Sequence, residues 1–155
     1  MKHKFFATGF VLAVCIVVFL VVNSRPVSMN LRFQGTAYEQ HTEIENGITI
    51  TLEGNLHNKV FQKDKFTGYV TITSEDYPSD FDAISLAFNK HGLAKCKLEK
   101  DGNEFGILTV DKKFELLSIK ITNEKFNDSK TPILAAPATN ISQAKEIIQK
   151  LNALQ

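Results

Sequence analysis

An uninterrupted apolar stretch from Phe5 to Val22 constrains this chain more than any other feature of its sequence. The stretch carries no charge, and only Thr8 and Gly9 interrupt its large apolar side chains. As an α-helix it would be about 27 Å long, which is close to the thickness of the hydrocarbon core of a bilayer. We therefore predict a cytoplasmic stub and a transmembrane anchor in residues 1–24, with the membrane as the first expected partner.

A cleaved signal peptide and a lipoprotein signal remain as alternatives to an anchor. A signal peptide would be cleaved near Ser24, although the apolar run is longer than the about 7–15 residues typical of such signals. A lipoprotein signal is suggested by Leu12 to Cys15, which resembles a lipobox. That motif requires a small residue where Val14 stands, and the apolar run continues past Cys15. An uncleaved signal-anchor therefore fits the stretch best.

The charges that flank the anchor predict its orientation. Lys2 and Lys4 precede it, and Arg25 alone follows it closely. This contrast places the N-terminus in the cytoplasm and the C-terminal part outside, in a single-pass protein of the cell membrane. Pro26 ends the helix because proline lacks the amide hydrogen, so residues 25–28 form a short linker. Residues 29–155 then form a single extracytoplasmic domain.

The composition of this outer domain excludes several classes of protein. The 16 basic and 17 acidic residues that follow the apolar stretch give a net charge of −1, which argues against a nucleic-acid partner and against strong electrostatic attraction to lipid head groups. Cys96 is the only cysteine beyond the apolar stretch, so no disulfide scaffold holds the domain. A hydrophobic core must stabilise it instead, and eight of the twelve phenylalanines lie in this part of the chain.

Apolar residues alternate with polar ones along most of the outer domain, which predicts about seven short strands of an antiparallel meander. The expected strands are 29–33, 48–52, 66–73, 82–88, 94–98, 105–110 and 114–121. Asn46-Gly47 predicts a hairpin turn, because both residue types tolerate positive φ. Glycines such as Gly68 and Gly106 follow large apolar residues and predict bulges that curl the sheet. A shift in the apolar pattern near Leu117 predicts a further bulge.

The end of the chain predicts one helix. Asn140 is the expected N-cap, and Gln143 follows at the spacing of a capping box. Five apolar residues then form a stripe on one helical face: Ile141, Ala144, Ile147, Ile148 and Leu151. We expect this stripe to cover the open face of the curled sheet, so the predicted fold class is mainly β (α+β).

The C-terminal part also carries a resemblance to a known group of proteins. The segment from Ile133 to Asn140, followed by Gln143-Ala144, the strand around Phe66-Thr67-Gly68 and the hairpin from Gly106 to Phe114 carry it. Together they resemble a group of small uncharacterised Gram-positive extracytoplasmic membrane-anchored proteins of unknown function. The resemblance implies an extracytoplasmic location and a β-rich fold, and it implies no activity.

No catalytic, cofactor or metal motif is evident among the polar residues. The three histidines of the outer domain, His41, His57 and His91, fall at predicted turns and lack the spacing of a metal site. Cys96 alternates with apolar neighbours, which predicts a buried and inert thiol; a nucleophilic role would need His91 as its base. An acidic group made of Glu75, Asp76, Asp80 and Asp82 would allow a calcium site, but it lacks EF-hand spacing and is interpreted as a solvated turn. Asn127 and Asn140 begin glycosylation patterns, and helix capping explains the second one better.

These observations predict a membrane-anchored protein whose outer domain is a binding or interaction module without catalysis or cofactors. Its partner would be an unidentified protein or small molecule. The alternative is a secreted or surface carrier of a small apolar ligand, held on the concave face of the sheet. A densely packed interior would favour the interaction module over the carrier.

Overall fold

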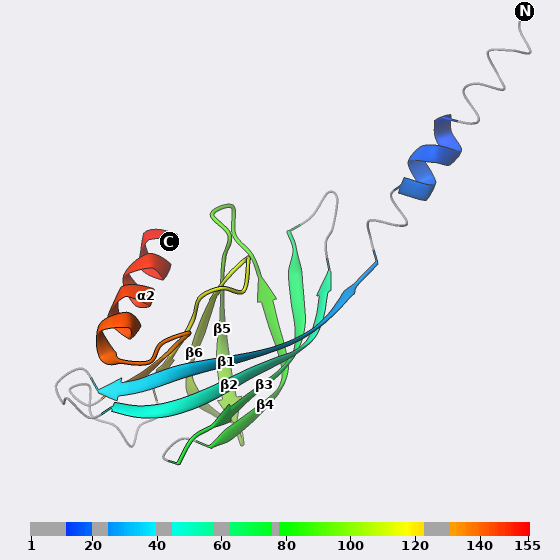
Figure 1. Ribbon diagram of the computed structural model, residues 1–155. Coiled ribbons are helices and arrows are strands. Elements are labelled where there is room, and N and C mark those ends of the chain that lie inside the picture. The colour runs from blue at the N-terminus through cyan, green and yellow to red at the C-terminus, as the bar shows by residue number, and fades with distance from the viewer. Residues whose placement is uncertain (1–11, 20–24, 40–44, 58–62, 76–77, 123–130) are drawn as a thin grey trace, which may run out of the picture.

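The computed structural model describes residues 12–19, 25–39, 45–57, 63–75, 78–122 and 131–155. Beyond a helical segment at 12–19, the described residues form one antiparallel sheet and a C-terminal helix (Figure 1). The strands are β1 (Val27–Glu39), β2 (Glu45–His57), β3 (Lys65–Thr73), β4 (Ser79–Ala87), β5 (Leu93–Lys100), β6 (Asn103–Asp111), β7 (Leu117–Ile121) and β8 (Pro132–Ala136). The C-terminal helix is α2 (Ile141–Ala153).

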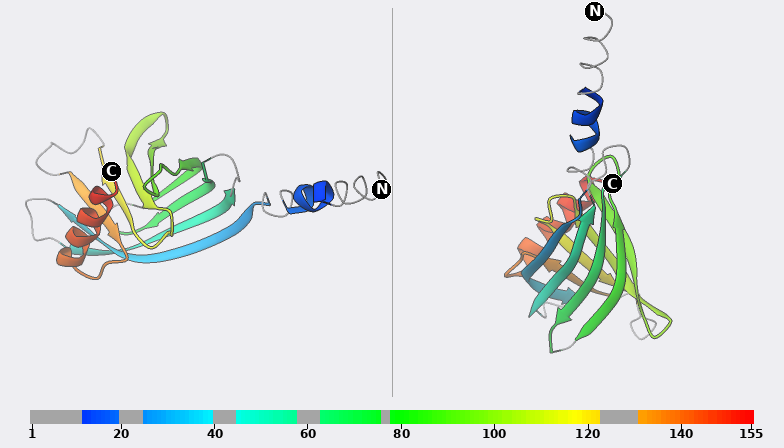
Figure 2. Two further views of the ribbon diagram at one scale, coloured as in Figure 1. Left: turned by 90° about the horizontal axis from the view of Figure 1, so that it is seen from above. Right: turned by 90° about the vertical axis from the view of Figure 1, so that its right-hand side faces the viewer.

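The described strands follow one another as an up-and-down meander that curls until it is nearly barrel-shaped. Their order in the sheet is β4-β3-β2-β1-β8-β7-β6-β5, so the first strand pairs with the last. The two edge strands, β4 and β5, lie beside each other and leave a seam in the wall (Figure 2). The expected mainly β fold is therefore confirmed. The described sheet has eight strands rather than seven, because β8 was not expected.

Alternation along the strands sends every second side chain into the interior of the curled sheet. A large group of these side chains is shielded from solvent completely or nearly so: Phe66, Phe81, Ile50, Leu52, Ile72, Leu86, Leu98, Leu108, Leu117, Ile119, Ile121 and Leu134. A side chain without accessible surface borders no space that a water molecule could enter. These residues therefore pack against one another as a dense core.

Glycines allow neighbouring strands to approach closely where the sheet bends. Gly54 in β2 is opposite Gly68 in β3. A Cβ atom on Gly54 would collide with the Thr67 carbonyl oxygen, and one on Gly68 would collide with the Glu53 carbonyl oxygen. The pairing of β3 with β4 shifts register directly after Gly68. The prediction that glycine marks a bulge is confirmed at this position.

Helix α2 packs on the outer surface of the sheet and not on the open face where it was expected. Its buried residues Ala144, Ile147 and Leu151 form a second apolar cluster, with Tyr38 of β1 among their partners. Side chains of β8 alternate between this cluster and the interior, so β8 is buried on both faces. Asn140 caps the helix as predicted, accepting a hydrogen bond from the Gln143 backbone N–H at 3.0 Å.

Three local predictions are wrong or incomplete. Asn46 and Gly47 do not form a turn but lie within β2, opposite Ala37 and Thr36, and the connection between β1 and β2 falls outside the described residues. Phe114 is not in a strand but in a loop, with φ of 56°, and β7 begins only at Leu117. β1 begins at Val27, inside the expected linker.

The proposed anchor, Phe5 to Val22, is described only at residues 12–19. None of the described helices combines the length and the apolar character needed to cross a membrane.

Candidate functional site

The curled sheet has two ends, and the loops at one of them form the candidate site. We call this the entry end, because β1 begins there. The β4–β5 and β6–β7 connections lie at the same end (Figure 1), and Asp64, directly before β3, contacts Phe88 there. Strand pairing supports this placement: Val27 is opposite Leu56, and Leu93 is opposite Asp111. We call the opposite end, with the β3–β4 and β5–β6 connections, the far end.

Buried hydrogen bonds hold the β6–β7 loop of the entry end in a defined conformation. The Asp111 side chain is 7% exposed. Its carboxylate accepts backbone N–H bonds from Lys113 at 3.1 Å, Glu115 at 2.8 Å and Leu116 at 2.6 Å. Under this loop, the Phe114 ring packs against those of Phe66 and Phe88, each at a centroid distance of 5.5 Å. The loop therefore has both a polar and an aromatic support.

Hydrogen bonds also hold the β4–β5 loop in a defined conformation. The Asn89 side-chain oxygen accepts backbone N–H bonds from His91 and Leu93, both at 2.9 Å. Gly92 adopts φ of 77°, which glycine tolerates best. Residues 88–92 thus form a defined loop between the two edge strands, which are not neighbours in the strand order of the sheet.

Contacts between loops join the entry end into one surface. The Lys112 backbone N–H donates to the Gly92 carbonyl oxygen at 2.7 Å, and the Phe88 N–H donates to the Asp64 carbonyl oxygen at 3.1 Å. The Lys112 ammonium also pairs with the Asp64 carboxylate at 2.5 Å. These contacts tie the β4–β5 and β6–β7 loops to each other and to Asp64, the residue before β3.

Each end has a surface pocket. The pocket at the far end has a volume of about 380 Å³, and the pocket at the entry end has a volume of about 310 Å³. Three lysines from three different loops line this smaller pocket: Lys63, Lys90 and Lys112. Asp64, Phe88 and Asn89 complete its lining. One carboxylate against three ammonium groups leaves the pocket cationic, so its chemistry favours an anionic group.

The positive charge extends beyond the pocket. Residues 25–26, 63–65, 88–92 and 111–116 make up the described entry end, with six basic and three acidic residues. The basic residues are Arg25, Lys63, Lys65, Lys90, Lys112 and Lys113. Two of the acidic residues are already engaged, Asp64 with Lys112 and Asp111 with backbone N–H groups. The exposed surface of this end is therefore basic.

The far end has the opposite charge. Its described turns, residues 73–75, 78–80 and 99–104, contain five acidic residues and one basic residue. The acidic residues are Glu75, Asp80, Glu99, Asp101 and Glu104. The larger pocket lies here, and Asp80 and Lys100 are the charged residues in its lining. This pocket shows no comparable group of like charges.

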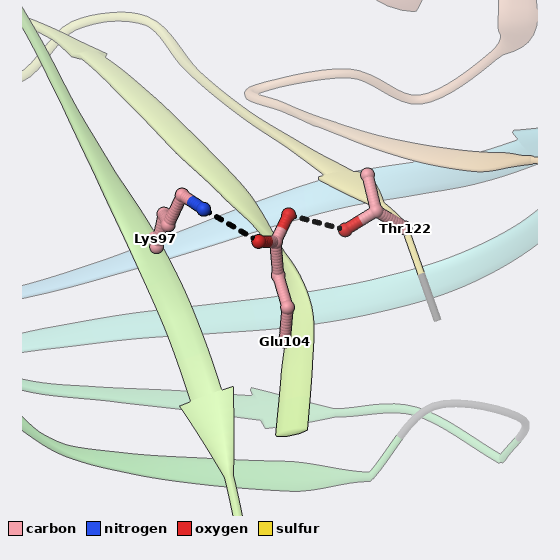
Figure 3. A network of polar contacts seen from close by, with 3 residues as sticks. All are labelled: Lys97, Glu104 and Thr122. Carbon is pink, nitrogen blue, oxygen red and sulfur yellow. Dashed lines mark hydrogen bonds and ion pairs between the residues drawn. The ribbon is translucent and has the colours of Figure 1, made fainter. Parts of the chain in front are cut away.

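A network on the outer wall near the far end engages Glu104 (Figure 3). The Lys97 ammonium lies 2.7 Å from one of its carboxylate oxygens, and the Thr122 hydroxyl donates to the other at 3.0 Å. The hydrogen bonds from Lys97 and Thr122 lower the pKa of Glu104. Lys97 also offsets repulsion, because Glu104 is paired with Glu99 across the strands. The solvated carboxylate is held by both neighbours, so we assign the network a structural role.

Cys96 lies at the seam between β4 and β5, partly buried against the core. Burial raises the pKa of its thiol to about 11, opposed by a hydrogen bond from the Ser85 backbone. A thiol with such a pKa stays protonated at neutral pH and is a poor nucleophile. The nucleophilic alternative that paired Cys96 with His91 finds no support in this environment, since the His91 side chain is exposed at the entry end.

The other candidate residues do not converge on a site. His57 Nε2 lies 3.3 Å from the Thr67 hydroxyl, while His41 and Asn127 fall outside the described residues. Asp76 of the proposed calcium loop is also outside them. Among the residues that the structure describes, no group of three or more histidine, cysteine or carboxylate side chains could hold a metal ion.

Sequence reasoning missed the cationic pocket although it placed turns at all three of its lysine-bearing segments. The sequence analysis did not consider at which end of the sheet each turn lies. In an up-and-down meander, every second connection lies at the same end of the sheet. The Lys63, Lys90 and Lys112 turns are the second, fourth and sixth connections, so this rule alone would have gathered them.

Comparisons with known proteins leave the site to be interpreted from its own geometry. No family model matches the chain, and neither a curated protein nor a solved structure is significantly similar to it.

Proposed function

We propose that this chain is a single-pass membrane protein whose outer domain is a binding or interaction module without catalysis. The apolar stretch from Phe5 to Val22 is the proposed anchor, with the N-terminus in the cytoplasm and the β-rich domain outside. The observation that carries the proposal is the dense interior. Twelve large apolar side chains of the core have almost no accessible surface, and six further apolar residues that pack against the core are partly exposed. This packing supports recognition by the outer surface and the loops.

The packed interior favours this function over the carrier of an apolar ligand. A pocket for such a ligand typically occupies about 300–1,000 Å³ and is lined mainly by apolar side chains. The two pockets described above are instead open to the surface and contain charged residues in their lining. Binding of a fluorescent fatty-acid analogue to the full chain measures this difference. We expect no saturable binding, and tight one-to-one binding would favour the carrier.

Membrane anchorage is tested separately on the full chain in cells. We expect the protein to stay with the membranes after an alkaline carbonate wash, and the outer domain to be digested by protease added to intact cells. Release of the full chain by carbonate would contradict the anchor. Protection of the domain in intact cells would contradict its orientation.

A further inference from the structure

We propose that the basic entry end docks on the anionic head groups of the membrane that holds the anchor, with the Lys63, Lys90 and Lys112 pocket receiving a head-group phosphate. This inference rests on the proposed function, because the anchor brings the domain to the surface. It adds an orientation to that function: the domain would lie with one defined end against the lipid.

Chain length places the entry end close to the membrane. Five residue steps separate Val22, the last residue of the proposed anchor, from Val27 at the start of β1. Even fully extended, such a segment spans only about 17 Å. The entry end therefore cannot move far from the head groups, whereas the far end lies at the other end of the strands (Figure 2). Val27 itself is 51% exposed, as suits a residue next to the interface.

Charge complementarity decides which end faces the lipid. The entry end carries six basic residues in its described part, and the far-end turns carry five acidic ones. An anionic surface attracts the first and repels the second, so both forces favour the same orientation. The attraction acts within about a Debye length of the surface, about 8 Å at physiological ionic strength. The short linker keeps the lysines near that range.

The pocket makes the attraction more specific than a diffuse basic surface. Lys63 and Lys90 come from separate loops and converge with Lys112 around one opening. Backbone hydrogen bonds and the Lys112–Asp64 ion pair join Asp64, the neighbour of Lys63, to the loops that carry Lys90 and Lys112 before any anion arrives. Binding of a phosphate therefore needs little ordering of the backbone. Lys65 and Lys113 lie outside the pocket and would meet neighbouring head groups.

The test measures lysine acylation by a membrane-impermeant reagent on the full chain in vesicles, read by peptide mass spectrometry. Lys113 reports on the entry end and Lys97 on the outer wall near the far end, and both are exposed. In vesicles that contain phosphatidylglycerol, we expect Lys113 to react severalfold more slowly than in vesicles of phosphatidylcholine alone. Lys97 should react equally in both, and high salt should remove the difference.

A pair of matched variants tests the pocket. The double substitution Lys63→Gln and Lys90→Gln keeps the Lys112–Asp64 ion pair. One lysine near an anionic surface contributes about a fivefold factor in binding, so this variant should dock about twentyfold more weakly and lose most protection of Lys113. The control variant, Lys100→Gln and Lys120→Gln, removes the same charge from exposed positions outside the entry end. This control should keep the protection of Lys113. Circular dichroism and thermal unfolding verify that both variants fold.

Three results would overturn the inference. The first is equal labelling of Lys113 in the two kinds of vesicle, and the second is equal loss of protection in both double variants. The third is protection of Lys113 by millimolar inorganic phosphate in phosphatidylcholine vesicles together with no effect of phosphatidylglycerol, which would assign the pocket to a free anion. Retention of the chain by carbonate-washed vesicles is a separate measurement. It identifies failure of the anchor independently of failure of docking.

Discussion

The two ends of the curled sheet share a backbone plan and differ in charge. Both consist of short connections between antiparallel strands, and each has a surface pocket. The described entry end is basic, and the described far-end turns are acidic. The chain beyond the apolar stretch has a net charge of −1, which led to the expectation that it would not strongly attract lipid head groups. A near-zero total can thus hide two separated charges, and only their placement determines which surfaces attract.

The ends also differ in how they are supported. Three rings, those of Phe66, Phe88 and Phe114, pack beneath the entry-end loops. Near the far end, the rings of Phe81 and Phe105 form a pair at 4.8 Å, and Phe105 is only partly buried. The end that presents the lysines therefore has the larger aromatic foundation. A preformed anion site requires such packed side chains beneath its loops, because they keep the loops in one conformation.

The largest expected effect concerns this aromatic support. Phe66→Ala should lower the free energy of unfolding by about 3–5 kcal/mol, because the ring has no exposed surface and its loss leaves a cavity. Phe105→Ala should cost less, because its ring is partly solvated. Urea unfolding of the full chain in mild detergent measures both values. A larger loss for Phe105→Ala would mean that the far end holds the fold together.

The next effect concerns the seam that runs between the two ends. Burial raises the pKa of the Cys96 thiol from 9.0 to about 11, so the reactive thiolate should be about a hundredfold scarcer near pH 8 than for an ordinary cysteine. In a Cys15→Ser background, alkylation of the folded chain should be slower than that of the urea-unfolded chain by about that factor. Equal rates would show that the seam opens readily to solvent.

A third prediction tests the polar support of the entry end. Asp111→Ala should cost about 1–3 kcal/mol of unfolding free energy, because three backbone N–H groups lose their acceptor. Asp111→Asn keeps one acceptor oxygen and should cost less. Asp80→Ala at the far end is the matched control, because Asp80 is exposed, and denaturant midpoints compare the three variants. If the two alanine variants lost equal stability, the difference in loop support between the ends would be refuted.

The smallest effect is expected from the network near the far end. Hydrogen bonds from Lys97 and Thr122 lower the pKa of Glu104. A carboxylate with a lowered folded-state pKa stabilises the protein above its unfolded pKa, and this contribution is lost as the pH falls through the folded-state value. Glu104→Gln should therefore slightly flatten the acid limb of a plot of stability against pH, and Glu99→Gln should not. Because Glu104 lies at the surface, where solvent screens ion pairs, a large change would contradict the structural role of this network.

Sequence periodicity was sufficient for most of the sheet, because half-buried strands alternate visibly. Strand β8 was not predicted, because its side chains are apolar on both faces. Ile133 packs under α2 and Leu134 faces the interior, so no alternation of polar and apolar residues remains. The turn predicted at Asn46-Gly47 is wrong because strand pairing overrides the local turn preference. The preference of these two residues for a turn stabilises the chain less than the hydrogen-bonded ladder, which pairs β1 with β2 in register up to Glu45. Cys96 was predicted from its strand neighbours to be buried, and it is partly buried against the core. The lysine pocket was missed.

The sequence by itself determined the apolar stretch, the strand periodicity, the capped C-terminal helix and the absence of a disulfide scaffold, since each depends on neighbours a few residues apart. Only the tertiary structure decided that α2 lies outside the sheet, that a dozen large core side chains are shielded from solvent, and that Lys63, Lys90 and Lys112 share one pocket. The physical reason is that composition gives only the total charge and the total apolar surface of the chain, without their positions in space. Recognition depends on where curling of the sheet brings distant residues together.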